Sequence, residues 1–244
     1  MAENEIEAKS VAEGHVDQIV QKRFFPTKGK SGVLVEIGAA RPDFLSIGSY
    51  YRQIKWRVVS IEPNPDFYVL HQQQGNEIYA FACGDRDEDD VDFIVVDSHR
   101  TKYEDGEVSF ESYSSLGIKD SFAKLNDHLD KRTIKVRLRR LSTLFESEIP
   151  GITEIDILAV DVEGWELEVL SGLDSKKHRP RVMILENLFN EEKYRSHLRT
   201  LGYRFWRRLY PNDVYVDDEF VGAGFQRLGF YAECLWFSLT GPSK

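Results

Sequence analysis

At 244 residues, with 41% hydrophobic and 30% charged residues, the chain is long enough for one large domain with a substantial core. Its net charge of −9 argues against general nucleic-acid binding, which needs a basic surface. Two cysteines, Cys83 and Cys234, make neither a disulfide framework nor a zinc site. No apolar run reaches the roughly 18 residues of a membrane span, and the acidic N-terminus does not look like a secretory signal, so we expect a cytoplasmic protein.

The first 30 residues predict an amphipathic helix that ends near Phe24-Phe25-Pro26. Its apolar residues at helical spacing are Ile6, Val11, Val16, Ile19 and Val20. We expect residues 1–30 to cap an edge of a sheet, the alternative being a lid over a substrate pocket. The remainder, residues 31–244, contains no Pro/Gly/Ser-rich linker and is predicted to be one domain.

The pattern strand, turn, helix, strand follows between Val33 and Pro65. Val33 to Ile37 is a short β-branched run of the kind buried on both faces, and Gly38-Ala39-Ala40 follows it, with a helix expected from about Pro42. Arg57 to Ile61 is a second such run, which ends in Glu62 and Pro63. A carboxylate in that place could accept hydrogen bonds from a ribose diol, so we interpret the unit as nucleoside-binding, although a βαβ unit without a ligand has the same pattern.

The middle of the chain predicts a helix over 67–74 and three further strands, over 77–82, 91–96 and 132–140. The first of these strands ends in Cys83-Gly84-Asp85, where Asp85 could accept from an adenine amino group or begin a charged surface turn. The last strand has a basic face, which could meet an anionic substrate or solvent. The hydroxyl-rich residues 111–117 are either a loop or a pocket wall.

Alternating strands and helices continue to the end of the chain, which predicts a mainly parallel sheet with helices on both faces. Strands are expected over 155–160 and 181–185, a hairpin over 203–216 and a closing strand near residues 231–237; helices are expected over 142–149, 166–170 and 191–201. The strand over 155–160 is followed by Asp161-Val162-Glu163-Gly164, and the strand over 181–185 by Glu186-Asn187.

Polar residues therefore follow five predicted strands. These residues are Glu36 with Gly38, Glu62, Asp85, Asp161 with Glu163, and Glu186 with Asn187. Because the carboxyl ends of parallel strands meet at one edge of a sheet, we expect these groups to surround a ligand. Unpaired polar groups at the ends of buried strands would otherwise carry a desolvation cost.

Four segments together resemble the FkbM family of S-adenosylmethionine-dependent methyltransferases. They are VEIGAARPDFLSIGSYYR, SIEPNP, FACGD and, most specifically, LAVDVEGWELEVLSGL. The resemblance spans roughly residues 31 to 216. It implies a Rossmann-like class I methyltransferase fold, with a seven-strand sheet whose last strand is antiparallel. It also implies methyl transfer to a hydroxyl group of a sugar, glycan or small natural product.

The same resemblance implies roles for individual residues. Glu36, Gly38 and Ala39 would flank the methionine part of the cofactor; Glu62 and Pro63 would meet its ribose; Cys83, Gly84 and Asp85 would meet its adenine; Asp161 would lie beneath the sulfonium and the acceptor. The turn departs from the usual G-x-G-x-G pattern at Ala40 and Pro42, where glycine or small residues are common. That departure also disfavours a nicotinamide oxidoreductase, whose turn needs further glycines.

For catalysis, we expect Asp161 or Glu163 to orient or deprotonate the acceptor hydroxyl. Glu186 and Asn187 either hydrogen-bond the substrate or the backbone or, together with Asp161, hold Mg²⁺ in a set like that of catechol-type O-methyltransferases. A catalytically inactive methyltransferase-like binding module is the alternative function. The oligomeric state stays open, and the hairpin residues Trp206, Tyr210, Asn212 and Asp213 are further candidates for the pocket wall.

Overall fold

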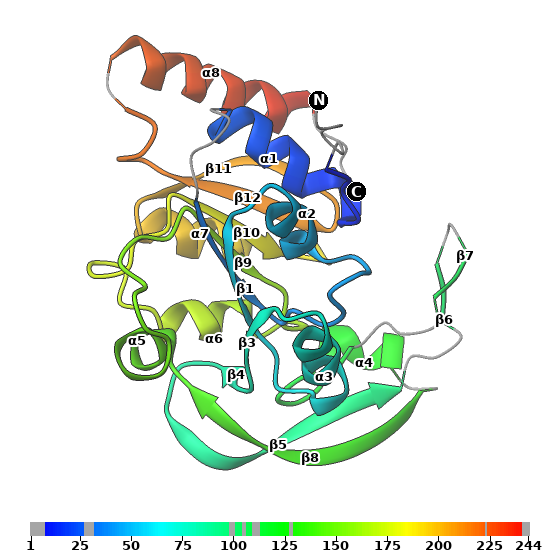
Figure 1. Cartoon of the computed structure of the whole chain (residues 1–244). Helices are drawn as coiled ribbons and strands as arrows, with labels where there is room; N and C mark the ends of the chain where they lie inside the picture. The colour runs from blue at the N-terminus through cyan, green and yellow to red at the C-terminus, as the bar shows by residue number, and fades with distance from the viewer. Residues whose placement is uncertain are drawn as a thin grey trace, which may run out of the picture.

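The computed structural model describes residues 8–26, 32–97, 101–103, 106–108, 113–126, 129–222 and 224–240. Its centre is a seven-strand sheet in the order β11-β12-β10-β9-β1-β2-β3 (Figure 1). The strands are β1 (Val33–Ile37), β2 (Arg57–Ile61), β3 (Glu77–Tyr79), β9 (Ile157–Val160), β10 (Val182–Glu186), β11 (Tyr203–Leu209) and β12 (Asn212–Asp217). All neighbours run parallel except the pairs made by β12, which is antiparallel to β10 and β11. The predicted Rossmann-like sheet is confirmed.

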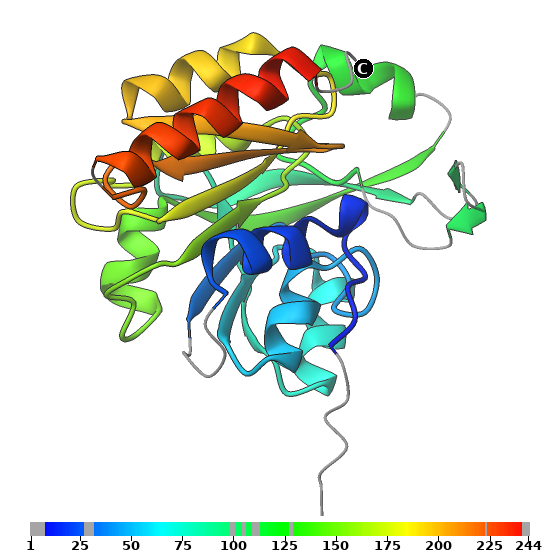
Figure 2. The same cartoon turned by 90° about the horizontal axis from the view of Figure 1, so that it is seen from above.

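Helices cover both faces of this sheet, as predicted. They are α1 (Val16–Phe24), α2 (Ile47–Gln53), α3 (Pro65–Gln73), α4 (Asp120–Asn126), α5 (Leu141–Thr143), α6 (Glu166–Ser171), α7 (Glu192–Thr200) and α8 (Phe225–Thr240), with the short turns η1 (Glu13–His15) and η2 (Leu144–Glu148). Strand residues alternate between the faces. Leu34 of β1 packs in one core with residues of α1, α2 and α8, whereas Val35 packs in a second core with α5, α6 and α7. Helices α1 and α8 lie next to each other (Figure 1 and Figure 2), joined by the Arg23–Glu233 ion pair.

A second, smaller sheet is inserted between β3 and β9. It contains β4 (Ala82–Cys83), β8 (Asp130–Arg139) and β5 (Glu88–Asp97), and a hairpin of β6 (Thr101–Tyr103) and β7 (Gly106–Val108) extends from it. The single strand predicted over 77–82 is therefore wrong: the chain leaves the main sheet after Tyr79 and re-pairs at Ala82 with β8. The reason is a separate small core, made of Ala82, Phe93, Val95, Val136 and Leu138.

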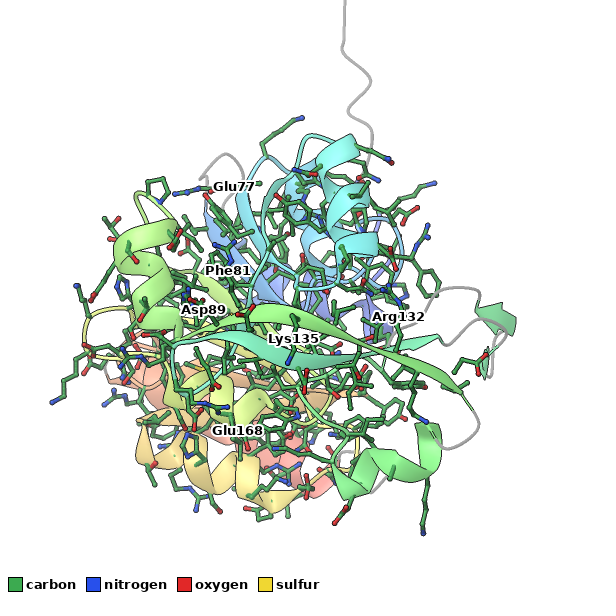
Figure 3. The ribbon with its side chains drawn as sticks, turned by 90° about the horizontal axis from the view of Figure 1, so that it is seen from below. Glu77, Phe81, Asp89, Arg132, Lys135 and Glu168 are labelled. Atoms are coloured by element: carbon green, nitrogen blue, oxygen red, sulfur yellow. The ribbon has the colours of Figure 1, made fainter. Side chains whose placement is uncertain are left out.

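The predicted basic face, with Lys135, Arg137 and Arg139, belongs to β8 and lies on the outside of this second sheet, where Figure 3 labels Lys135. Acids of the neighbouring strand β5 pair with it: Asp92 with Lys135 at 2.6 Å and Asp89 with Arg139 at 2.6 Å. These cations are accordingly neutralised by surface ion pairs, which are worth little individually. The structure does not direct this face at a substrate.

Two other sequence predictions fail at the level of secondary structure. The segment near residues 231–237 is part of helix α8 rather than a closing strand, because Phe230 and Cys234 recur at helical spacing and are buried against the sheet. The helix expected from Pro42 begins only at Ile47, after the N-cap Ser46. Within the described residues, no helix is long and apolar enough to cross a membrane. The predicted residues Ile6, Glu111 and Ser112 lie outside the described part of the chain.

Candidate active site

A cavity of about 930 Å³ opens where β1, β2, β9 and β10 end. Its volume is near the upper end of the roughly 300–1,000 Å³ that is typical of small-molecule sites. Of the residues predicted for a site, those that line it are Glu36, Gly38, Ala39, Glu62, Pro63, Cys83, Asp161, Glu163 and Glu186. The carboxyl ends of separate parallel strands thus bring their polar residues to one cavity.

Gly38 forms the floor of the cavity at the end of β1. Its φ is +75°, and a Cβ there would lie 1.7 Å from the backbone oxygen of Asp161. Glycine is therefore required because the ends of β1 and β9 approach each other closely, and the close approach is to the protein's own backbone. The Gly38 N–H donates to Ile61 O at 3.0 Å, which fixes the turn against β2 as well.

Glu36 is buried beside this turn and has protein partners of its own. It accepts a hydrogen bond from Gly48 N at 2.9 Å in the first turn of α2, and Arg52 lies 3.4 Å from its second oxygen. Both contacts hold the carboxyl group in a fixed position at the edge of the cavity. Glu36 therefore ties β1 to α2 and also offers negative charge to a ligand.

Glu62 is 5% exposed, and its carboxyl group is held in place from two sides. It accepts from Ala40 N at 2.9 Å and from Asn64 N at 2.7 Å. Burial raises the pKa of Glu62 to about 7, and the charge of Glu36 adds to the rise, while the two backbone hydrogen bonds oppose it. The end of β2 consequently presents a fixed carboxyl group to the cavity.

The side of the cavity beyond Glu62 is apolar. It is lined by Phe67, Phe81, Ala82, Cys83 and Phe93. Burial raises the pKa of the Cys83 thiol, so this side chain behaves as a small apolar group. Gly84 and Asp85 do not line the cavity: Asp85 is exposed and contacts Arg86 at 3.3 Å, which is the charged surface turn that the sequence also allowed.

Asp161 and Glu186 form a pair of carboxyl groups at the ends of β9 and β10, hydrogen-bonded to each other. Asp161 is exposed to the cavity, whereas Glu186 is 8% exposed. Burial, followed by the nearby charges of Glu13 and Glu166, raises the pKa of Asp161 to about 8. Burial and Asp161 likewise raise the pKa of Glu186 well above its usual range. Two carboxyl groups this close hold a proton between them at neutral pH.

Glu166 is a third carboxyl group within reach: oxygens of Asp161, Glu166 and Glu186 lie within 4.8 Å of one another. Glu166, however, already accepts from Val162 N at 3.1 Å and Gly164 N at 3.0 Å, and Tyr194 donates to its other oxygen. Its role in the structure is to brace the loop that carries Asp161. That role uses three of the roughly four lone-pair positions that the carboxylate could offer to an ion.

Asn187 does not join the acids, contrary to the magnesium set considered from the sequence. Its side chain accepts from Glu191 N at 2.8 Å and donates to Asp213 Oδ2 at 2.9 Å, beneath the start of α7. It is 2% exposed and does not line the cavity. The set of Asp161, Glu186 and Asn187 is therefore not assembled in this structure.

The family model described as the methyltransferase FkbM domain matches residues 36–205. This chain belongs to the FkbM methyltransferase domain family. No curated protein sequence matches the chain.

Two solved structures are similar to this FkbM-family chain. One is methyltransferase FkbM from Methylobacillus flagellatus KT, at 13% identity and a TM-score of 0.45, covering 76% of this chain and 43% of that one. The other is precorrin-6y C5,15-methyltransferase from Geobacter metallireducens GS-15, at 12% identity and a TM-score of 0.39, covering 82% of this chain and 85% of that one. The chain thus spans less than half the length of the first.

The FkbM domain match leaves out part of the cavity wall. Ala12–His15 and Tyr210–Asn212 line the cavity, yet both segments lie outside residues 36–205. Tyr210 and Asn212 had been considered as wall residues from the sequence, whereas Glu13 had not. The residues Tyr113–Leu116 also line the cavity, while Trp206 and Asp213 of the hairpin are buried in the core. Nothing local in the sequence marks Glu13, because its electrostatic partner Asp161 lies far along the chain.

Proposed function

We propose that this FkbM-family chain is an S-adenosylmethionine-dependent methyltransferase that methylates a hydroxyl group of a sugar, glycan or small natural product. The observation that carries the proposal is that Glu62 and the Asp161–Glu186 pair border the same cavity. A nucleoside-binding acid and a proton-accepting pair are the two parts that such a reaction requires, and a family methyltransferase domain surrounds them.

The residues of the cavity fit the cofactor chemically. The fixed carboxyl group of Glu62 offers acceptor oxygens for a ribose diol, and the apolar side with Phe67, Phe81 and Phe93 suits a purine ring. Glu36 and the turn Gly38-Ala39 offer a carboxylate and bare backbone to the amino acid part. The bound cofactor would supply a methyl group activated by a positively charged sulfur.

The chain's own contribution to the chemistry is to orient the acceptor and to take up its proton. Above about pH 8, Asp161 is ionised and accepts the hydroxyl proton, while Glu186, which is hydrogen-bonded to it, holds it in position. A carboxyl pKa raised to about 8 makes Asp161 a stronger base than a solvent-exposed aspartate. Holding the hydroxyl at near-attack distance contributes on the order of 7–11 kcal/mol in favourable cases.

Cofactor binding is tested by calorimetric titration with S-adenosylhomocysteine and, separately, with NAD. We expect the first to bind and the second not to bind. Glu62→Ala should weaken S-adenosylhomocysteine binding at least a hundredfold, because the buried ribose acceptor is lost. Glu148→Ala, at an exposed acid outside the cavity, is the matched control and should bind as the wild type does. NAD binding, or unchanged affinity in Glu62→Ala, would contradict the proposal.

Methyl transfer is tested with isotopically labelled donor and a panel of hydroxylated acceptors. Asp161→Asn should lower the rate by roughly 10²–10⁴-fold while S-adenosylhomocysteine affinity changes less. We expect activity to persist in a chelator, since Glu166 and Asn187 are engaged by the protein. Loss of activity that Mg²⁺ restores would instead support the magnesium hypothesis. Cofactor binding without transfer to any acceptor would favour the inactive binding module.

A further inference from the structure

One wall of the cavity is built by two segments that flank the family domain and contact each other. A Cβ placed on Gly14 would lie 3.2 Å from Tyr210 O and 3.6 Å from Leu209 O, at a φ of +57°. The turn Glu13–His15 therefore rests directly on the backbone of the β11–β12 hairpin. We refer to residues 12–15 and 210–212 together as the flanking wall.

The flanking wall is fixed to the core and is not a free lid. Val16 and Val20, which follow the turn in α1, are 0% exposed and pack in the core shared with α2 and α8. Tyr51 of α2 donates to Asp17 O at 3.0 Å, and the Asp17 carboxylate accepts from Ser10 Oγ at 2.6 Å. The turn is already ordered in the folded protein, so a ligand that binds there meets a preformed surface and does not have to order it.

Glu13 is the acid that this wall adds to the cavity. It borders the same space as Asp161 and Glu186 and acts electrostatically on both of them. Its other wall neighbours, Tyr210 and Asn212, carry a phenol ring and an amide. The wall therefore adds hydrogen-bonding groups and one carboxyl group to the cavity that the acid pair borders.

Acidic groups outnumber basic ones around the cavity. Among the described lining residues, the acids are Glu13, Glu36, Glu62, Asp161, Glu163 and Glu186, and the bases are His15 and Arg41. The guanidinium of Arg41 lies 3.0 Å from Asp43, which offsets its charge. Burial raises the pKa of Glu13 to about 7, so Glu13 carries its full negative charge only above that pH, and there a second anion beside the reacting hydroxyl would be repelled by it.

We propose that the flanking wall determines acceptor specificity, and that Glu13 selects acceptors carrying a neutral or positively charged group beside the reacting hydroxyl. Neutral and amino sugars fit this requirement, whereas a carboxylate or a phosphate at that position is rejected. The inference rests on the proposed methyl transfer, and it adds the charge class of the acceptor. Glu13 acts as a specificity-determining residue and is separate from the cofactor-binding acids.

The first test needs no known acceptor. The probe is an analogue of S-adenosylhomocysteine that carries an amino group where the transferred methyl group would be, so that its positive charge points at the acceptor side. Glu13→Gln should weaken this analogue roughly five- to tenfold and leave S-adenosylhomocysteine unchanged within about twofold. Glu148→Gln removes the same charge on the surface and is the matched control. Equal affinities of wild type and Glu13→Gln for the analogue would overturn the proposal.

The second test compares acceptors that differ only in charge, such as a methyl glucoside and the corresponding methyl glucuronide. The wild type should prefer the neutral member at least tenfold, and Glu13→Gln should narrow this ratio. High salt should narrow it as well, because charges are screened. Melting temperatures establish that the variant is folded. Failure to bind S-adenosylhomocysteine would refute the proposed function, whereas normal binding with an unaltered preference would refute only the role of Glu13.

Discussion

Acids that look alike in the sequence have different partners in the folded chain. Glu36 is paired with Arg52 and a helix N-terminus, Glu62 with two backbone N–H groups, and Asp161 with Glu186. For Glu62 and Asp161, burial raises the pKa of the carboxyl group, and the hydrogen bonds that each of them makes oppose this rise. The different properties of these three acids in the cavity follow from their partners and not from their residue type.

Gly38 allows a sharp test of the geometry of the cavity floor. Gly38→Ala should cost more than about 4 kcal/mol or prevent folding, because a Cβ there would overlap the Asp161 backbone oxygen at 1.7 Å. Gly75→Ala is the matched control: its φ of +71° is similar, but no atom lies within 4 Å of the added Cβ. It should lose only about 1–2 kcal/mol from backbone strain. Urea unfolding measures both, and equal losses would disprove the clash.

Glu62 predicts how the stability of the ligand-free protein changes with pH. Since folding raises its pKa from 4.5 to about 7, the folded state favours the protonated form. Protonated Glu62 contributes roughly 3 kcal/mol at most to the free energy of unfolding. This contribution is fully present below pH 4.5 and is lost as the pH rises through 7. Glu62→Gln cannot ionise, so its free energy of unfolding should fall less between pH 5 and about 8.5. Parallel pH profiles of wild type and variant, measured by urea unfolding, would contradict this.

At the scale of elements, the sequence predicts the bounds of a strand best where the strand is buried on both faces. The strands β1 and β2 are found at their predicted bounds because each is a β-branched run buried on both faces. Helix α8 was mistaken for a strand, since its aromatic residues have high strand propensity and its buried positions are recognisable only once the sheet face is known. The break between β3 and β4 depends on pairing with β8, a strand far along the chain.

Asn187 should matter for stability and not for metal binding. Asn187→Ala removes the hydrogen bonds to Glu191 and Asp213 at the start of α7, for a loss of about 2 kcal/mol or a melting temperature lower by roughly 4–8 °C. Calorimetric scans with and without a chelator should show the same decrease. If the chelator abolished the difference in melting temperature between the wild type and Asn187→Ala, Asn187 would be a metal ligand.

Across the whole molecule, the two sheets differ in how much core supports them. The smaller sheet has its own limited cluster around Phe93, whereas β1 and β9 lie between two large cores. Hydrogen exchange should therefore reveal β5 and β8 opening at a lower free energy than β1 and β9. Because Phe93 also lines the cavity, S-adenosylhomocysteine should slow exchange in β5. Equal protection of the two sheets, or no change on binding, would contradict this prediction.

The composition of the cavity was predictable only on the side built by strand ends. Parallel strands bring their carboxyl ends to one edge whatever the details of packing, so Glu62, Asp161 and Glu186 could be placed together from the sequence. Glu13 and Tyr210 meet through the packing of a turn on a hairpin, which no periodic pattern encodes. Asp85 does not line the cavity for a related reason. The strand before it, β4, pairs with β8 in the second sheet, and Asp85 lies on the surface beside Arg86.

The contact between the turn at Gly14 and the hairpin at Tyr210 also bears on how such an enzyme diversifies. Under the proposed function, the residues assigned to the methyl donor come from the matched domain, residues 36–205, and the flanking wall comes from two segments outside it. Grafting both segments from one relative onto another would then transplant the choice of alcohol and leave the methyl-donor site as it was. Grafting one segment alone would leave the two parts of the wall mismatched.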